Sequence, residues 1–162
     1  MMKNSEIVYL TRSRLVEIEN ELMELKTNGR KLMAEKIAEA RSHGDLSENA
    51  EYDAAKEAQS HLEFKIGKLE TMLSRVKIIS PDEMPSDEVY ILSVVKVRDL
   101  SMKEDFTYTL VSPEEADFEL DKISVTSPIG NALLGKKINE TVEITVPAGV
   151  IKYKIIDISK LD

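Results

Sequence analysis

The chain has 162 residues, of which 42% are hydrophobic and 32% charged, and its formal net charge is -8. That length suffices for one compact domain or for a small domain that carries an extended arm. The sequence holds no cysteine, so disulfides, cysteine-based zinc sites and thiol nucleophiles are excluded. No apolar run approaches the roughly 18 residues that a membrane span needs, and we expect a soluble, cytoplasmic protein with no membrane partner.

The charge is divided unevenly along the chain. Residues 1–79 contain 13 basic and 14 acidic residues, a net charge of -1, whereas residues 80–162 contain 9 and 16, a net charge of -7. Most of the affinity of proteins for nucleic acid comes from neutralising its phosphates. A chain without a basic tail or stripe is therefore a poor candidate for binding nucleic acid alone, and a protein partner with a basic or mixed surface fits better.

Two stretches in the N-terminal half show the alternating three- and four-residue spacing of a coiled-coil seam. The seam positions of the first stretch are Leu15, Ile18, Leu22, Leu25, Met33, Ile37 and Ala40. Those of the second are Tyr52, Ala55, Gln59, Leu62, Ile66, Leu69, Leu73 and Val76. Because Met33 stands eight positions after Leu25, the seam slips by one residue, and we expect a local kink or overwinding near residues 27–30.

Two such helices joined by a short turn predict an antiparallel hairpin. Each helix would have about 28 to 30 residues and a length of about 40–45 Å. Thr11 stands where the first helix needs an N-cap, and Gly44 where that helix would end in the left-handed conformation. Residues 1–79 are thus predicted to form an arm with an acidic tip at residues 43–49. The two seams pack against each other within the hairpin, so no coiled-coil dimer is required to bury them and we expect a monomer.

The tip carries two carboxylates three residues apart, Asp45 and Glu48. Charged residues at the end of a stiff helical hairpin indicate that the hairpin carries these groups to a site on another molecule. On spacing alone, the pair is also an acidic variant of a helix capping box, in which Asp45 accepts a backbone N–H and Glu48 reaches back. His43 beside them is a candidate metal ligand or acid/base group, although a solvated histidine near a helix C-terminus is the favoured interpretation.

After the arm, residues 80–88 contain Pro81 and Pro85 and are predicted to be a linker. Short β-branched runs then alternate with turn residues, which predicts a small antiparallel sheet or half-barrel. The predicted strands span residues 90–97, 106–111, 123–125, 141–146 and 150–158.

Between the third and fourth of these strands, the sequence predicts a short helix. Pro128 stands at its first turn, Gly135 follows its end, and Ser127 is placed to cap it. The predicted fold class is therefore α+β: a long antiparallel α-helical coiled-coil hairpin, followed at residues 89–162 by a small antiparallel β-sheet domain with a short helix.

Residues 38–52, AEARSHGDLSENAEY, resemble the tip signature of the Gre transcript-cleavage factors of bacterial RNA polymerase. Residues 123–129, ISVTSPI, with residues 134–136, LGK, resemble the C-terminal signature of the same family. The order and spacing of both signatures agree, and the likeness covers nearly the whole chain. The chain is more similar to the GreA than to the GreB branch, because the helix after the tip lacks a dense basic patch and offers only Lys56, Lys65 and Lys68.

The resemblance implies that the coiled coil enters the secondary channel of a backtracked RNA polymerase and presents Asp45 and Glu48 to its active centre. There the two carboxylates would help to hold the second Mg²⁺ and orient the attacking water while the polymerase cleaves the 3′ end of the nascent RNA by the two-metal route. The arrested complex would thereby be rescued. The protein itself would not be an enzyme and would hold no cofactor when free, since two carboxylates in water bind Mg²⁺ weakly.

The resemblance assigns roles to further residues. Arg41, Tyr52 and Lys56 would contact RNA or the polymerase channel; the alternatives are a solvated arginine, seam packing and a solvated helix face. Ser127, Pro128 and Ile129 correspond to the segment that grips the coiled-coil rim of the polymerase's largest subunit, while chemistry alone explains them as a helix start. A weak contact with DNA is left open.

Three other functions compete with this interpretation. The C-terminal domain also resembles the FK506-binding-protein (FKBP) fold, which raises peptidyl-prolyl isomerase activity, but Phe106, Tyr108, Phe118 and Tyr153 are too few and too dispersed to predict an aromatic-lined pocket. The others are a structural coiled-coil adaptor and a channel-binding inhibitor of the polymerase. An inhibitor would be expected to have an altered acidic tip, whereas both tip carboxylates stand at the spacing of a cleavage factor.

Overall fold

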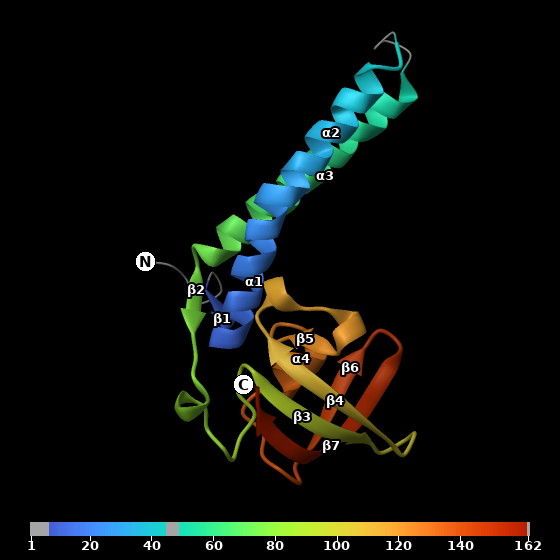
Figure 1. The fold of residues 1–162 in the computed structure, drawn as a ribbon. Helices are drawn as coiled ribbons and strands as arrows, with labels where there is room; N and C mark the ends of the chain where they lie inside the picture. Colours follow the sequence, from blue (N-terminus) through green and yellow to red (C-terminus); the bar gives the residue numbers. More distant parts are fainter. Residues whose placement is uncertain (1–6, 45–48, 162) are drawn as a thin grey trace. The chain divides into compact units, whose positions relative to one another are not determined.

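The computed structural model describes residues 7–44 and 49–161 and divides the chain into two compact units (Figure 1). Residues 14–74 form a helical arm, while the segments before and after them form a β-rich unit. The predicted combination of a helical hairpin with a small β domain is confirmed. Among the described residues, no helix combines the length and apolar character needed to cross a membrane.

The arm consists of two helical stretches that run side by side in opposite directions (Figure 1). The first is continuous and comprises α1 (Arg12–Glu24), the π-helical segment η2 (Leu25–Gly29) and α2 (Arg30–Arg41). The second is α3 (Ala50–Leu73), whose 24 residues are fewer than predicted. At 1.5 Å per residue α3 is about 36 Å long. Val76 does not continue the seam, because the helix ends at Leu73 and Val76 begins a strand.

The predicted seam is confirmed along the whole arm. Every predicted seam side chain from Leu15 to Ala40 and from Tyr52 to Leu73 is buried or half-buried. The most buried of these residues are Ile18, Ala40, Ala55 and Ile66, with 0%, 4%, 8% and 2% of their surface exposed. Burial of one apolar stripe on each helix is therefore the main term that holds the hairpin together.

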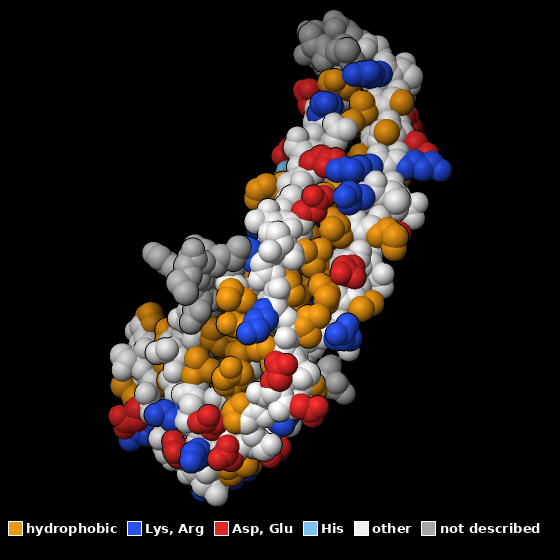
Figure 2. All heavy atoms as spheres, turned by 90° about the vertical axis from the view of Figure 1, so that its left-hand side faces the viewer, with side chains coloured by type: hydrophobic (Ala, Val, Ile, Leu, Met, Phe, Trp, Pro, Cys, Tyr) orange, Lys and Arg blue, Asp and Glu red, His pale blue; other side chains and the backbone are white. Residues whose placement is uncertain are grey.

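Ion pairs bridge the two helices beside the seam. They join Lys26 to Glu70 at 3.3 Å, Arg30 to Glu63 at 2.9 Å and Lys65 to Glu21 at 3.1 Å. The hydrogen-bonded guanidinium of Arg30 lowers the pKa of the Glu63 carboxyl. Figure 2 shows acidic and basic side chains mixed along one face of the arm, with apolar ones between them. Exposed pairs contribute little stability each. They join opposite charges across the hairpin and add to the contacts of the seam.

The segment η2 absorbs the one-residue slip of the seam. The N–H of Arg30 donates to the carbonyl of Leu25, five residues back instead of the four of an α-helix. This wider turn takes up one extra residue, so Met33 returns to the side of the helix on which Leu25 lies. The helix is thus irregular where a kink or overwinding was predicted, but the overwinding is wrong, since an inserted residue has to be accommodated by a wider turn and not by a tighter one.

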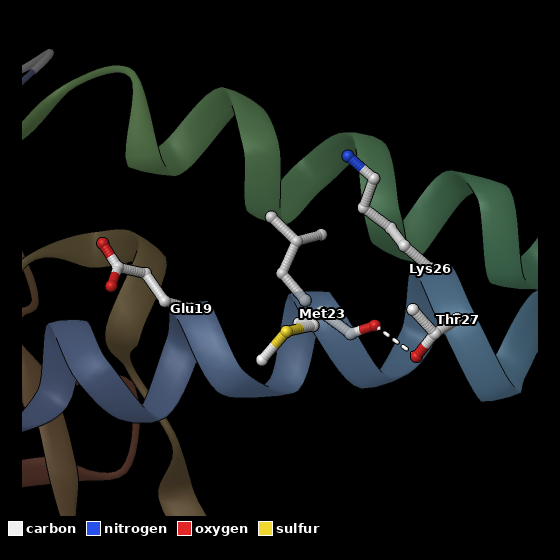
Figure 3. Close-up of a pocket in the computed structure, with 5 residues that line it drawn as sticks. Glu19, Met23, Lys26 and Thr27 are labelled. Atoms are coloured by element: carbon white, nitrogen blue, oxygen red, sulfur yellow. Dashed lines mark hydrogen bonds between the residues drawn. The ribbon is translucent and has the colours of Figure 1, made fainter.

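Two polar side chains of this wider turn form hydrogen bonds to the helical turn before it. The hydroxyl of Thr27 donates to the carbonyl of Met23 at 2.8 Å, beside a shallow hollow that is shown in Figure 3. Asn28 Nδ2 donates to Glu24 Oε1 at 2.8 Å. Gly29 is half-buried opposite Leu62, and a Cβ at this glycine would lie 3.3 Å from Leu62 Cδ1. The small residue lets the two helices approach each other closely where the turn widens.

The five predicted strands are confirmed, with small shifts at their ends. They are β3 (Ser93–Asp99), β4 (Glu104–Val111), β5 (Lys122–Ser124), β6 (Thr141–Val146) and β7 (Gly149–Lys160). They form one sheet in the order β5-β4-β3-β7-β6. The sheet is mixed and not purely antiparallel, because β5 lies parallel to β4. After β4 the chain turns back through two short 3-10 helices, η5 (Pro113–Glu115) and η6 (Phe118–Leu120), so it enters β5 in the same direction.

Both ends of the predicted arm, residues 1–79, belong to the β-rich unit, where they form a second sheet. β1 (Val8–Leu10) pairs in parallel with β2 (Val76–Ile78), and the N–H of Tyr9 donates to Ser112 Oγ at 2.9 Å. The predicted linker is also packed, because Met84 in it forms a small apolar core with Ile79, Leu92 and Val111. Strand pairing and this core therefore place residues 8–10 and 76–84 with the β-rich unit.

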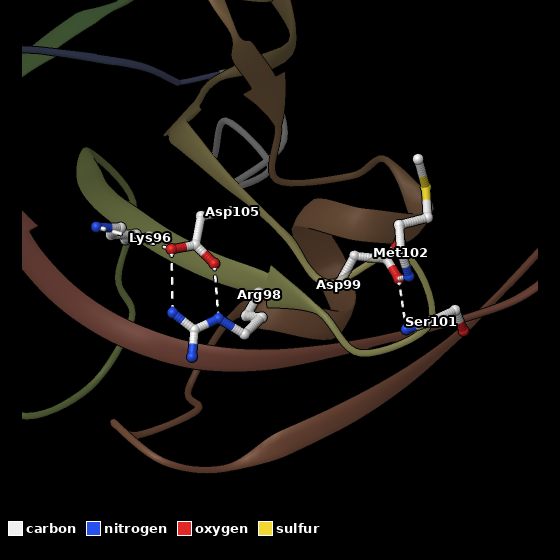
Figure 4. A network of polar contacts seen from close by, with 6 residues as sticks. All are labelled: Lys96, Arg98, Asp99, Ser101, Met102 and Asp105. Carbon is white, nitrogen blue, oxygen red and sulfur yellow. Dashed lines mark hydrogen bonds and ion pairs between the residues drawn. The ribbon is translucent and has the colours of Figure 1, made fainter.

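The main core of the β-rich unit lies between the sheet and α4 (Pro128–Leu133). Its buried residues are Val89, Val95, Val97, Leu110, Leu133, Val142, Ile144, Tyr153 and Ile155. At the far turn of the β3–β4 hairpin, Asp99 accepts the N–H groups of Ser101 and Met102, and Arg98 holds Asp105 through two bonds of 2.8 and 3.2 Å (Figure 4). The turn is thereby fixed by side chains at its base.

Three aromatic residues converge on the core. Phe106, Tyr108 and Tyr153 have ring centroids 6.2–6.3 Å apart, and the hydroxyls of the two tyrosines lie 3.2 Å from each other. Burial and the Tyr108 hydroxyl raise the pKa of Tyr153. The prediction that these aromatics are dispersed is wrong for these three and correct for Phe118, which is 93% exposed. The three rings pack on one another.

Deletion of Asn28 tests the role of η2. Removing one residue here restores a seven-residue spacing from Leu25 to Met33, so the π turn is no longer needed and the seam stays continuous. We expect helical circular dichroism to be retained, with a melting temperature within about 4 °C of the parent.

Deletion of Ser60, an exposed residue in the regular helix α3, is the matched control. It rotates one half of the seam by about 100°, and we expect the melting temperature to fall by more than about 10 °C. Equal losses for the two deletions would show that η2 does not absorb the slip.

Candidate functional site

The tip of the arm lies between α2 and α3. α2 ends at Arg41 with Ser42 as its C-cap, and Gly44 has a φ of +118°, a value that favours glycine, as predicted. Asp45 and Glu48, the two predicted tip carboxylates, lie outside the described residues. The structure thus defines the two flanks of the tip, and these flanks determine where the carboxylate-bearing segment starts and ends.

Asn49, not Asp45, caps the second helix. Its Oδ1 accepts the N–H of Tyr52 at 3.1 Å, and its Nδ2 donates to the carbonyl of Ala40 at 2.6 Å. Asp45 and Glu48, the pair of the capping-box interpretation, lie outside the described residues, so that interpretation stays a prediction; the cap of α3, which begins at Ala50, is Asn49. The role of Asn49 was not predicted from the sequence. The available signal was an asparagine, a preferred N-cap residue, directly before a helix-forming run that starts with alanine and glutamate.

Other contacts join the flanks of the tip. The Arg41 guanidinium lies over the Tyr52 ring, 5.6 Å from its centroid, which is within cation–π range. His43 Nε2 lies 3.5 Å from Glu51 Oε2, and both side chains are more than half exposed. The structure therefore brings together Arg41 and Tyr52, two of the predicted contact residues. Lys56, the third, is exposed one turn further along α3 and donates to Gln59.

The described part of the arm tip does not itself present a complete metal site. In residues 7–44 and 49–161, three or more His, Asp or Glu side chains nowhere gather as metal ligands would. Mg²⁺ is ordinarily held in proteins by one or two carboxylates together with waters or substrate oxygens. Asp45 and Glu48 match such a partial ligand set in number and chemistry.

The second predicted site, Ser127, Pro128 and Ile129, lies where β5 leads into α4. Hydrogen bonds and close backbone packing hold this segment. Ser127 caps α4: its Oγ accepts the N–H of Gly130 at 3.1 Å and donates to the carbonyl of Ser124 at 2.6 Å. A Cβ on Gly130 would lie only 2.0 Å from the same carbonyl oxygen, so this position requires glycine. Pro128 is exposed, while Ile129 is half-buried against the main core. Ser127 and Ile129 therefore hold the segment in place. Of the three predicted binding residues, Pro128 is the one exposed at the surface.

The close approach at Gly130 predicts a clear difference between two glycines. Gly130→Ala forces its Cβ into the Ser124 carbonyl, and we expect the free energy of unfolding to fall by at least about 2 kcal/mol. Gly67→Ala is the matched control, because Gly67 lies in α3 with nothing within 4 Å of an added Cβ. This change should stabilise the protein by about 0.5–1 kcal/mol. Chemical denaturation measures both, and destabilisation of similar size would contradict the argument.

Fold and site together define a two-part α+β protein that has a coiled-coil arm and a β-rich unit. Two family models match consecutive parts of the chain: "Transcription elongation factor, N-terminal" over residues 8–78 and "Transcription elongation factor, GreA/GreB, C-term" over residues 84–160. The chain therefore belongs to the GreA/GreB family of transcription elongation factors.

Individual relatives match almost the full chain. It is 54% identical over 155 residues to the transcription elongation factor GreA of Chlorobaculum parvum, covering 95% of this chain and 98% of the relative. The GreA of Chloroherpeton thalassium is 51% identical over 154 residues, with the same coverage. Among solved structures, GreA factor homolog 1 of Thermus thermophilus is 27% identical, covers 94% of this chain and 99% of its own, and has a TM-score of 0.43.

Proposed function

We propose that this protein is a transcription elongation factor that binds bacterial RNA polymerase and stimulates Mg²⁺-dependent cleavage of the 3′ end of backtracked nascent RNA. The observation that carries the proposal is the match to the GreA/GreB family over both units, in a chain that keeps two carboxylates in the turn of its helical arm. Cleavage would give an arrested complex a new RNA 3′ end from which to resume.

The arm is suited to entering a narrow channel. Two helices that share one buried seam form a stiff rod, and α3 alone is about 36 Å long. Near-neutral charge and mixed surface signs would let the arm pass between protein walls without strong repulsion. In this proposal the arm enters the secondary channel and carries the tip to the active centre.

At the tip, Asp45 and Glu48 would each offer carboxylate oxygens to the active centre of the polymerase. Mg²⁺ held mainly by the polymerase would supply Lewis acidity there. The same carboxylates would orient the attacking water by accepting its hydrogen bonds. Because Asn49 caps α3, neither carboxylate is needed at the cap position of this helix.

The remaining tip residues would bind and orient the RNA end. Arg41 and Lys56 carry positive charge toward the phosphates, and the ring of Tyr52, held under Arg41, lies on the same flank. The free protein would be a monomer in the cytoplasm and would not cleave RNA, since its ligand set is completed only by the polymerase. Mg²⁺-dependent cleavage by the purified chain alone would contradict this.

The β-rich unit would anchor the factor on the rim of the polymerase's largest subunit. Pro128 would make the contact, positioned by the cap of Ser127 and the buried side of Ile129. The rigid backbone here means that little conformational freedom is lost on binding.

Substitution of the tip carboxylates tests the chemistry. Asp45→Asn and Glu48→Gln keep the size of each side chain but remove its charge, so we expect RNA cleavage in a stalled, backtracked complex to fall about 100-fold or more. Binding to the polymerase should stay within about twofold.

The readout for both variants is the release of short 3′-end fragments in the presence of Mg²⁺. Glu57→Gln, an exposed carboxylate further along α3, is the matched control and should cleave as the parent does. Unchanged cleavage by both tip variants would reject the tip chemistry. General loss of transcription with the unmodified factor would instead indicate an inhibitor.

Substitution of Pro128 tests the anchor. Pro128→Ala removes the exposed ring at the start of α4, and we expect affinity for the polymerase to fall roughly tenfold, while cleavage at saturating factor persists. Pro113→Ala is the matched control, because Pro113 is an exposed proline at the start of η5 in the same unit. Equal affinities of the two variants would place the anchor elsewhere.

A further inference from the structure

One carbonyl group ties together the two flanks of the tip. The carbonyl oxygen of Ala40 accepts the N–H of His43 at 3.2 Å and Nδ2 of Asn49 at 2.6 Å. Ala40 is 4% exposed and Asn49 is half-buried, so water competes poorly for these bonds. The chain before the tip segment and the chain after it are thus held at the same point.

The two hydrogen bonds of Asn49 do different things. The bond from the Tyr52 N–H to Oδ1 caps α3, and aspartate or serine would cap it equally well. The bond from Nδ2 to Ala40 crosses the hairpin and needs a donor on the same side chain. Aspartate has no such donor, and serine lacks the second polar atom. These two residues therefore separate the cap from the crossing bond.

We propose that Asn49 is a positioning residue for cleavage: its bond to Ala40 fixes the separation of the end of α2 from the start of α3, the two flanks between which the tip is carried. The inference rests on the proposed function. A misplacement of about 1 Å in a reacting group can cost about 100-fold in rate, so fixing the ends of so short a segment has a direct kinetic effect.

Between the described flanks of the tip, residues 41–44 and 49–52, the other contacts are weaker than this bond or of another kind. The pair of His43 and Glu51 is exposed on both sides, and exposed ion pairs are weak. The cation–π contact of Arg41 with Tyr52 holds two side chains, whereas the Asn49 bond acts on the backbone of α2. Asn49 therefore constrains the path of the chain itself.

The test uses Asn49→Asp and Asn49→Ser, which keep the cap and lose the crossing bond. In a backtracked complex with Mg²⁺, we expect the maximal cleavage rate at saturating factor to fall about tenfold or more for both. The factor concentration at half-maximal rate and the helical circular dichroism should change by less than about twofold. Asn139→Asp is the charge control, because Asn139 is exposed in a turn of the β-rich unit with a φ of 73°.

A second measurement needs no polymerase. The chain has no cysteine, so Ser42→Cys and Asp53→Cys, both exposed positions, allow spin labels on either side of the tip alone. We expect a narrow distance distribution with Asn49 in place and a distribution about twice as broad with either variant, since the crossing bond limits the separation.

The outcomes are distinct. If the unmodified protein does not stimulate cleavage, the proposed function fails, while the spin-label distances still test the crossing bond. If it does stimulate cleavage, three results overturn the positioning role: both variants reach the parent's maximal rate, the rate falls only in step with binding, or Asn49→Asp alone is impaired. The last result would assign the effect to charge.

Discussion

The apolar seam shared by the two helical stretches of the arm is the constraint on which the rest of the hairpin depends. Each stretch must keep its stripe facing the other, yet Leu25 and Met33 are one residue further apart than a heptad allows. Without the π turn of η2, the stripe beyond Leu25 would rotate by about 100°. Ala40 would then turn away from α3, and Asn49 would lose its acceptor. A helical irregularity in the first half of the arm thus determines the geometry at its end.

In the β-rich unit, too, local contacts fix the position of the predicted binding segment. Its exposed Pro128 lies on a short helix that could not hold its own position, since a single helical turn is unstable in isolation. The Ser124 carbonyl receives the Ser127 hydroxyl, and the missing Cβ of Gly130 allows α4 to pack directly against that carbonyl. In both units, hydrogen bonds to a backbone carbonyl fix the local path of the chain: those of Ala40 in the arm and those of Ser124 in the β-rich unit.

Sequence patterns predicted what depends on local periodicity. The seam, the five strands of the main sheet and the cap of α4 by Ser127 follow from the spacing of apolar residues and from the chemistry of Ser and Pro at a helix start. Contacts between segments that are distant in the sequence have no comparable spacing pattern, so they could not be predicted. The pairing of β1 with β2, the parallel direction of β5 and the meeting of Phe106 with Tyr153 are set by the path of the chain in space. Asn49 was missed because Asp45 offered a competing capping signal.

That competition bears directly on the chemistry of the tip. A carboxylate that caps a helix accepts backbone N–H groups, which lowers its charge density and restrains its direction. Such a group would have to give up its hydrogen bonds before it could bind a metal ion. Asn49 caps α3 with a neutral amide and leaves no cap position for Asp45 or Glu48 in that helix. Because the cap of α3 is the neutral Asn49, the start of this helix does not depend on the charge of either Asp45 or Glu48.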